Sequence, residues 1–258
     1  MTTIKLIFFI LVLGGFYFLE ERFPKRALEI PHLQRLKVHG TLAILNTVFM
    51  RLLITGPLFF WLTFVREREG TLSQLLGLSG LFEIIISVIV LDMLDYWWHR
   101  WNHRIPFLWL FHKVHHLDTH VDVTTSLRFH PGELFLSAVM KALWILVWGP
   151  SLWAFVIFEI TTSAYAQFHH SNIDLTDKWE KMIRWIHMTP RVHASHHTVK
   201  DRTRDANFST IFSIWDRLFG TFQEPDFEEM KQLGLPYGRE SYLSLSATLR
   251  APLVSSKV

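Results

Sequence analysis

Histidine is the residue type that most strongly suggests chemistry in this sequence. Nearly all of the fifteen histidines lie within residues 99–197. There, an H-x-x-x-H motif at 99–103 precedes two H-x-x-H-H motifs, at 112–116 and 193–197. In a helix, residues three or four positions apart share a face, so each motif would direct its imidazoles toward one place. This arrangement is what a bound metal ion requires.

The three motifs supply eight candidate metal ligands, and a pair of adjacent histidines could supply one or two more. The motif residues are His99, His103, His112, His115, His116, His193, His196 and His197, and the pair is His169 and His170. Because so many imidazoles exceed what one ion binds, the sequence predicts two metal ions. One helical turn before His99, Asp95 is placed to accept a hydrogen bond from the second nitrogen of that ring and fix its orientation.

The available donor atoms limit the choice of metal and reaction. The sequence has no cysteine, so the ligands must be nitrogen or oxygen atoms, and imidazole suits zinc, copper, iron and nickel. The H-E-x-x-H motif, which gives zinc hydrolases their general base, is not present. Beside apolar segments, oxygen activation by iron makes better sense, because an unactivated C–H bond resists ordinary acid–base chemistry. The expected substrate is then a lipid.

Apolar blocks must position these histidines. Half of the residues are hydrophobic, and four or five blocks approach the length that crosses a bilayer. These blocks are Ile4–Leu19, Ala43–Val65, Leu81–Trp98, and the hairpin of Leu134–Gly149 and Ser151–Phe168. Short polar loops separate them and Trp and Tyr lie at their ends, which favours an integral membrane protein over a large soluble helical core. The first block lacks a small-residue cleavage pattern, so we expect it not to be a cleaved signal peptide.

Basic residues near the block ends predict the orientation in the membrane. Residues 22–37, which follow the first block, include five Lys or Arg residues, whereas the loop after the second block has only Arg66 and Arg68. Lysine and arginine are enriched in cytoplasmic loops. Counting crossings from a cytoplasmic first loop gives a multi-pass protein in which every histidine motif faces the cytoplasm.

The composition excludes other classes of protein. A formal charge of +3, with Lys and Arg scattered between apolar blocks, provides no basic stripe for nucleic acid. The lack of cysteine excludes a disulfide scaffold. Residues after Glu224 are polar and contain several Pro and Gly. We therefore expect a membrane-embedded domain over 1–224 and a polar C-terminal tail or cap over 225–258.

In their order and spacing, the three histidine motifs resemble those of the fatty acid hydroxylase superfamily, also called the sterol desaturase family. The resemblance covers most of the chain, from Glu21-Arg22-Phe23-Pro24 to the segment 213–221. It implies an all-α integral membrane bundle of about four transmembrane helices, with a cytosolic cap of histidine-bearing helices. It also implies an enzyme that uses two iron ions and O2.

Carried over residue by residue, the resemblance makes metal ligands of the eight motif histidines. His170 matches a further histidine of the family, and His169 is a neighbouring candidate. Asn207 and Asp216 match positions that recur in the family's last segment, which implies that they support the metal ligands or pack the cap.

The source of electrons and the substrate are not specified by the sequence. No haem domain and no nicotinamide or flavin motif is present, so electrons must come from a separate donor protein. Sterols, fatty acyl chains, sphingolipids, carotenoids and ether lipids all remain open as substrates, and so do hydroxylation and desaturation. Two other functions remain: a transporter whose histidines line a path across the membrane, and a metal-binding protein without oxygenase activity.

Overall fold

Helices form all of the regular structure. The computed structural model describes residues 2–239 and 243–254, and within these ranges it contains helices and isolated β-bridges but no strand. The predicted all-α class is therefore confirmed.

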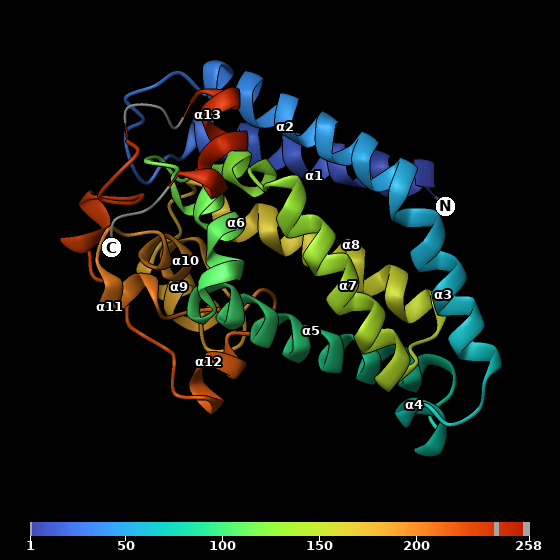
Figure 1. Ribbon diagram of the computed structural model, residues 1–258. Coiled ribbons are helices and arrows are strands. Elements are labelled where there is room, and N and C mark those ends of the chain that lie inside the picture. Colours follow the sequence, from blue (N-terminus) through green and yellow to red (C-terminus); the bar gives the residue numbers. More distant parts are fainter. Residues whose placement is uncertain (1, 240–242, 255–258) are drawn as a thin grey trace.

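Long helices run side by side between two ends of the molecule (Figure 1). They are α1 (Thr2–Arg22), α2 (His32–Leu53), α5 (Gly80–Arg104), α7 (Pro131–Trp148) and α8 (Leu152–His170). Helix α8 packs against α1 and α5, and α7 packs against α2, α3 (Thr55–Glu67) and α5. Their contacts enclose the main apolar core, formed by Leu62, Val65, Leu91, Trp98, Trp144, Ile145, Phe155 and Phe158.

The second predicted apolar block is two helices instead of one. Helix α2 ends at Leu53 and α3 begins at Thr55, with a bend of 47° between their axes. Pro57 lies in the first turn of α3 and has no N–H to continue the hydrogen-bond ladder of α2, which explains the break.

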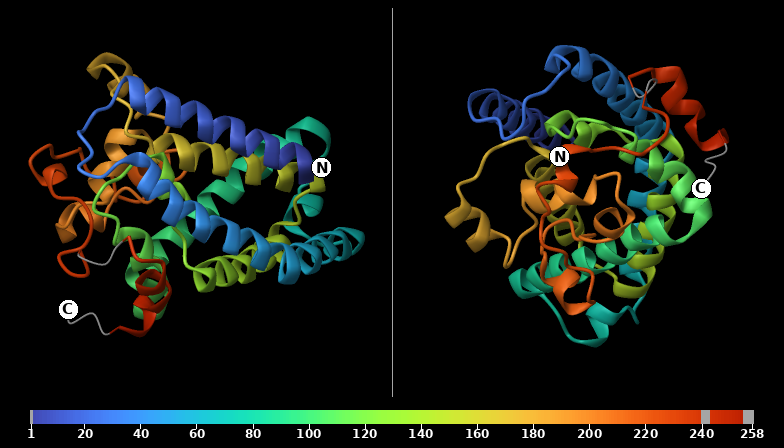
Figure 2. Two further views of the ribbon diagram at one scale, coloured as in Figure 1. Left: turned by 90° about the horizontal axis from the view of Figure 1, so that it is seen from above. Right: turned by 90° about the vertical axis from the view of Figure 1, so that its left-hand side faces the viewer.

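Short helices gather at the two ends of the bundle (Figures 1 and 2). Helix α4 (Leu72–Leu75) follows α3 at one end. The other end holds α6 (Pro106–His116), η1 (Val123–Leu127), α9 (Asp177–Ile183), α10 (Pro190–His196), α11 (Asp201–Arg204), α12 (Ile214–Leu218), η2 (Glu229–Lys231), α13 (Leu245–Arg250) and η3 (Ala251–Leu253).

Local signals define the predicted hairpin of α7 and α8. Pro131 begins α7, and the ring of His130 accepts a hydrogen bond from the N–H of Gly132 at 2.9 Å. Helix α7 ends at Gly149, which has a φ of 68°, and a Cβ there would lie 2.1 Å from the Thr71 hydroxyl oxygen. Only glycine fits this turn. Ser151 then caps α8 by accepting a hydrogen bond from the next turn.

Helix length and composition indicate fewer membrane spans than the four or so expected. Among the described residues, α7 is the one helix that is long and apolar enough to cross a membrane by itself. The bent pair that begins with α2 passes the same test as one broken segment.

The predicted C-terminal tail packs against α6. Leu235 and Ala251 join Val114 and Leu117 in a small apolar core, and Lys113 Nζ donates a hydrogen bond to the Val254 carbonyl at 2.9 Å. The parts of this predicted segment at 240–242 and 255–258 lie outside the described residues.

Candidate metal centre

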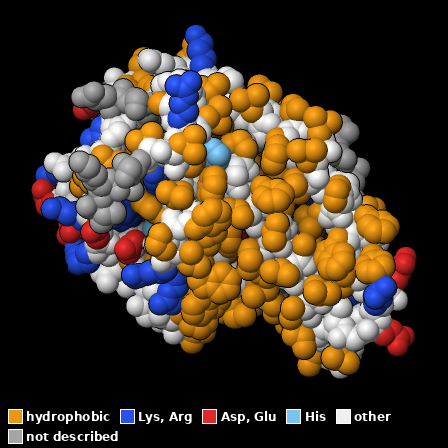
Figure 3. All heavy atoms as spheres, viewed as in Figure 1, with side chains coloured by type: hydrophobic (Ala, Val, Ile, Leu, Met, Phe, Trp, Pro, Cys, Tyr) orange, Lys and Arg blue, Asp and Glu red, His pale blue; other side chains and the backbone are white. Residues whose placement is uncertain are grey.

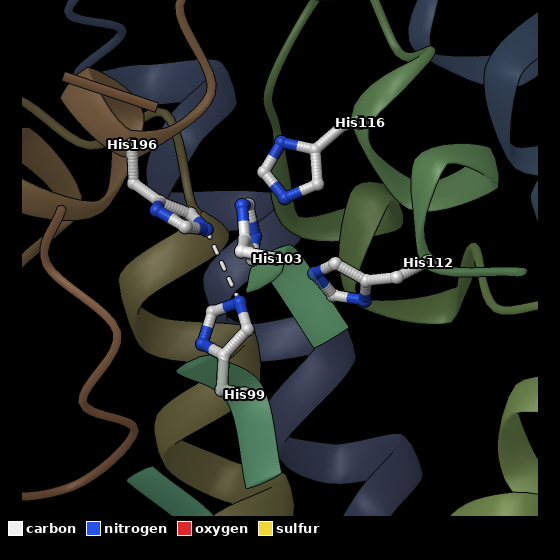
Figure 4. A group of neighbouring side chains, drawn as sticks. All are labelled: His99, His103, His112, His116 and His196. Carbon is white, nitrogen blue, oxygen red and sulfur yellow. Dashed lines mark hydrogen bonds between the residues drawn. The ribbon is translucent and has the colours of Figure 1, made fainter. Parts of the chain in front are cut away.

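Two groups of histidines meet at the end of the bundle where the short helices gather. Within each group, one ring nitrogen of every residue lies within 4.8 Å of those of the others. Cluster A consists of His99, His103, His112, His116 and His196, and cluster B consists of His115, His170, His193 and His197. Figure 4 shows the rings of cluster A pointing toward one another from α5, α6 and α10. The structure thus brings together residues from distant parts of the sequence.

Each H-x-x-H-H motif contributes to both clusters. In α6 the first and last histidines of the motif, four residues apart, join cluster A, and the middle one joins cluster B. The motif at 193–197 does the reverse, because its first and last histidines join cluster B. Consecutive residues lie about 100° apart around an α-helix, so adjacent histidines point to different places. One short helix can therefore serve two metal ions.

Backbone carbonyls fix the tautomers of two rings in cluster A. His99 Nδ1 donates to the Phe208 carbonyl at 2.7 Å, and His196 Nδ1 donates to the Ala206 carbonyl at 2.6 Å. A carbonyl can only accept, so each Nδ1 carries the proton and each Nε2 of the neutral ring bears a lone pair. The two Nε2 atoms nevertheless face each other at 3.1 Å.

Cluster B repeats this arrangement. His115 Nδ1 donates to the Arg128 carbonyl at 3.3 Å, and His170 Nδ1 donates to the Ala166 carbonyl at 2.6 Å. Their Nε2 atoms lie 2.9 Å apart. His193 Nε2 is also 2.9 Å from the Nε2 of His170. His115 and His170 therefore present Nε2 lone pairs to each other at 2.9 Å, and lone pairs at this distance repel unless a metal ion binds both.

Burial makes it unfavourable for a proton to be that cation. It lowers the pKa of His115, His116, His193, His196 and His197 well below 6.5, and the neighbouring imidazoles lower each pKa further. The rings are therefore neutral at neutral pH. In addition, the Nε2 atoms of His103, His112 and His116 have no hydrogen-bond partner among the described residues. Converging neutral imidazoles of this kind fit metal ions.

Carboxylates support cluster A but not cluster B. Within the described structure, Glu133 Oε1 accepts from His112 Nδ1 at 2.7 Å, and Asp205 Oδ1 accepts from His103 Nδ1 at 3.3 Å. The rings of cluster B that are oriented by hydrogen bonds use carbonyls. A carboxylate partner raises the basicity of a ligating imidazole.

The irregular segment after α11 supplies backbone carbonyls to three rings, from residues 206, 208 and 210. Ala206 and Phe208 bind His196 and His99, and the Thr210 carbonyl accepts from His169 Nδ1 at 3.2 Å. Carboxylates hold this segment in place through its N–H groups: Asp216 binds those of residues 208 and 209, and Asp92 binds those of 211 and 212.

Asp95 does not make the contact with His99 that we expected. His99 Nδ1 donates its hydrogen bond to the Phe208 backbone carbonyl. Asp95 Oδ2 instead accepts a hydrogen bond from the Thr210 hydroxyl at 2.8 Å. The segment after α11 lies against α5 here, so the Phe208 carbonyl occupies the position beside His99 Nδ1 that Asp95 was expected to fill. Asp95 thus braces the segment that orients the histidines.

The structure separates the two remaining histidine candidates. His170 is in cluster B, whereas His169 lies outside both clusters, although it is buried and its ring centre is 4.0 Å from that of His193. Asn207 has a φ of 58° and donates to Ser195 Oγ in α10 at 3.2 Å, so it lies behind the third histidine motif.

Sequence reasoning missed the specific roles of Glu133 and Asp205. Glu133 lies 21 residues from His112, and Asp205 lies 102 residues from His103, so no local spacing connects them. Only the tertiary packing of α6 against α7, and of α11 near α5, shows these pairs.

A cavity of about 310 Å³ adjoins both clusters. Its wall includes His99 and His112 from cluster A and His115, His170 and His193 from cluster B. A molecule in this cavity would therefore reach both groups of imidazoles.

Fold and site together define an all-helical protein with paired polyhistidine clusters beside an internal cavity. The model of the fatty acid hydroxylase family matches residues 84–221, which is more than half of the 258-residue chain. The chain belongs to the fatty acid hydroxylase family. The matched region contains every histidine of both clusters.

Similar proteins act on lipids, according to their names. Alkylglycerol monooxygenase of Danio rerio is 31% identical over 59% of this chain and 33% of its own length. Ornithine lipid hydroxylase of Rhizobium tropici is 25% identical over 60% of this chain and 46% of its own length. Human lathosterol oxidase is 27% identical over 59% of this chain and 50% of its own length. The chain thus spans a third to a half of each relative, and no solved structure matches it.

Proposed function

We propose that this chain is a membrane-bound, non-haem di-iron oxygenase that hydroxylates or desaturates a lipid C–H bond. The observation that carries the proposal is the convergence of neutral imidazoles, with one pair of Nε2 lone pairs in each cluster facing each other at about 3 Å. Two cations, one in each cluster, would relieve this repulsion. The family and its lipid-oxidising relatives support iron over the other metals that imidazole binds.

In this proposal the five histidines of cluster A hold one iron and the four of cluster B hold the other. When bound, the iron pair would supply the activation of O2 that oxidation of an unactivated C–H bond needs. The chain's own part is to orient the ligands. The carbonyls of residues 206 and 208 fix two rings of cluster A, and Glu133 and Asp205 fix two more.

The reaction requires an external reductant. Hydroxylation converts a C–H bond to C–OH with one oxygen atom of O2, and the other atom leaves as water with two electrons and two protons. Desaturation removes two hydrogen atoms from the lipid and, with the same two electrons and two protons, reduces O2 to two waters. We propose a separate electron-carrier protein as the donor.

The apolar surface supports a location in the membrane. The outward faces of the long helices carry many exposed large hydrophobic side chains, and Figure 3 shows them as a broad continuous area. The charged side chains visible in that view gather mainly at the end with the short helices. The basic loop after α1 lies at this same end, because the Lys25 N–H donates to the Asn172 carbonyl beside α8. We therefore propose that the histidine clusters face the cytoplasm.

Metal transport fits the position of these clusters less well than lipid oxidation does. The elements that carry their histidines, α6, α10 and the adjoining ends of α5 and α8, meet at one end of the bundle instead of following a path along it (Figure 1). Farther into the bundle, Lys5, Arg51 and Glu159 line a second cavity. Because Glu159 is already paired with Lys141, positive charge predominates there and would oppose the passage of a metal ion.

Expression of the chain in a host with its lipids analysed by mass spectrometry tests the proposal. We expect a product that has one additional oxygen atom or two fewer hydrogens and that forms only with O2. His115→Ala should abolish both this product and the iron of cluster B. A His115→Ala variant that keeps full activity and both irons would refute the proposal.

A further inference from the structure

The cavity beside the clusters has a wall with far more hydrogen-bonding groups than a hydrocarbon needs. Six of its polar residues follow two helices into the bundle. They are Glu133, Ser137 and Lys141 on α7, and Glu159, Ser163 and Gln167 on α8. Within each set the residues are four positions apart, so each helix presents one polar stripe to the cavity.

The two stripes lead from the histidines to an ion pair within the bundle. At one end, Glu133 binds the ring of His112. At the other end, Lys141 Nζ donates to Glu159 Oε1 at 2.6 Å and joins α7 to α8. The eight-residue step from Glu133 to Lys141 corresponds to about 12 Å of helix. An ion pair at mid-helix is costly in a membrane protein and commonly marks a functional site.

Some of the polar groups on this wall lack a partner. Gln167 is 1% exposed, and neither atom of its side-chain amide has a hydrogen-bond partner among the described residues. Ser209 also lies on the wall and is 1% exposed, and its hydroxyl has no hydrogen-bond partner within the described chain either. Burying an amide without a partner is unfavourable, so a bound molecule that supplies one would be recognised strongly.

Apolar side chains complete the wall near the clusters. Trp98, Phe129 and Leu134 lie there, and Phe129 stacks on His115 with ring centres 4.7 Å apart. An aliphatic chain or a sterol ring system would satisfy these residues but would leave the Gln167 amide and the Ser209 hydroxyl without hydrogen-bond partners. A site built for hydrogen bonds rejects a ligand without them.

A second cavity, of about 300 Å³, extends toward the surface between α1, α2 and α8. It shares Phe9, Glu159 and Ser163 with the first cavity, so the two adjoin. Leu6 and Phe8 line it and are also exposed on the apolar surface. The apolar chains of a lipid could leave the protein here.

Resting on the proposed oxygenase function, we propose that the first cavity binds the polar head segment of a lipid, one that bears at least two hydroxyl, amide or amine groups, unlike the single hydroxyl of a sterol. The two stripes bind this segment, and the C–H bond that is oxidised lies in or next to it. This C–H bond becomes C–OH with one oxygen atom of O2, and the other oxygen atom leaves as water with two electrons and two protons from the external donor. Sterol rings and the middle of a fatty acyl chain are not the targets.

Lipid binding by the purified, iron-loaded full chain in detergent tests this inference. Dissociation constants are measured without O2 and without reductant for four probes: 1-O-hexadecylglycerol, an ornithine lipid, lathosterol and hexadecanoic acid. We expect at least one of the first two to bind tenfold or more tighter than both others. Equal or tighter binding of lathosterol or hexadecanoic acid than of both head-group lipids would overturn the inference.

Two variants locate the binding groups. Gln167→Leu and Ser163→Ala should each weaken binding of the preferred head-group lipid three- to tenfold. Gln167→Leu removes an unpaired buried amide, so its thermal stability should equal or exceed that of the parent chain, and lost binding would not reflect misfolding. Thr63→Ala is the control, because this hydroxyl binds carbonyls of its own helix α3 outside the cavity. Unchanged binding in both cavity variants would contradict the inference.

The binding assay separates this inference from the proposed function because it needs no turnover. Selective binding of a head-group lipid without oxidation of any lipid would support the inference and refute the oxygenase. Oxidation of lathosterol with no selectivity for a head group would support the oxygenase and refute the inference.

Discussion

Two buried polar regions of this protein satisfy their side chains in opposite ways. In the first, Arg35 binds Asp118 through two hydrogen bonds of 2.8 Å and Asp122 through one of 2.5 Å, and all three side chains are fully buried. Opposite charges within the chain complete that network. In the histidine clusters, by contrast, the Nε2 lone pairs of neutral imidazoles face each other. The first region stabilises the fold by itself, whereas the second needs a cation from outside.

The ion network should be the more costly of the two regions to disrupt. Arg35→Met would leave two buried carboxylates without their cation, so we expect a loss of about 3 to 5 kcal/mol of folding free energy. Chemical unfolding monitored by circular dichroism would measure this loss. Lys37→Met is the control, since Lys37 is exposed on the same helix. If Arg35→Met changed the folding free energy by less than 1 kcal/mol, the ion network would not be a major source of stability.

Metal removal should affect only the histidine clusters. Ligand binding stabilises a folded protein by about 4 kcal/mol when free ligand is a thousandfold above Kd, so a chelator should lower stability by up to that amount. The loss should be local. Hydrogen exchange should increase in α6 and α10, while the start of α2, which carries Arg35, keeps its protection. An equal increase of hydrogen exchange in both regions, or no increase in either, would contradict the claim that only the histidine clusters depend on metal.

Acid should distinguish the regions in the metal-free protein. Burial keeps the pKa of the cluster histidines below 6.5, so the unfolded chain binds more protons and stability falls as the pH drops below about 6.5. Burial alone would raise the pKa of Asp118, but Arg35 outweighs it and holds that pKa well below 3.8. The ion network therefore stays intact at pH 5. A melting temperature that is unchanged from pH 7.5 to 5 would contradict this expectation.

The smallest effect concerns the difference between the two clusters. Glu133 supports His112 of cluster A, so Glu133→Gln should weaken metal binding there by about 10- to 100-fold and leave cluster B unchanged. Metal titration followed by competition with a calibrated chelator would resolve one weakened and one unchanged site. Glu159→Gln is a matched control because Glu159 binds Lys141 and no histidine. Two weakened sites, or none, would contradict this assignment.

The sequence predicted the helical class because its apolar blocks and histidine spacings are local patterns. The motif spacing also identified eight of the nine histidines that the structure brings together, since positions three or four apart share a helix face, and the adjacent pair at 169–170 supplied the ninth, His170. It did not show how the motifs divide between two clusters, because that depends on where α6 and α10 face each other. The supports of the ligands also escaped prediction. Asp95 lost its expected role to a backbone carbonyl from Phe208, a residue 109 positions from His99.

The iron content of single-histidine variants tests the central claim most directly. The parent chain, purified with iron, should contain two irons per molecule. His112→Ala, in cluster A, and His193→Ala, in cluster B, should each retain one, at opposite sites. A folded parent chain that binds no iron, or two variants that both keep two irons, would contradict the proposed pair of metal sites.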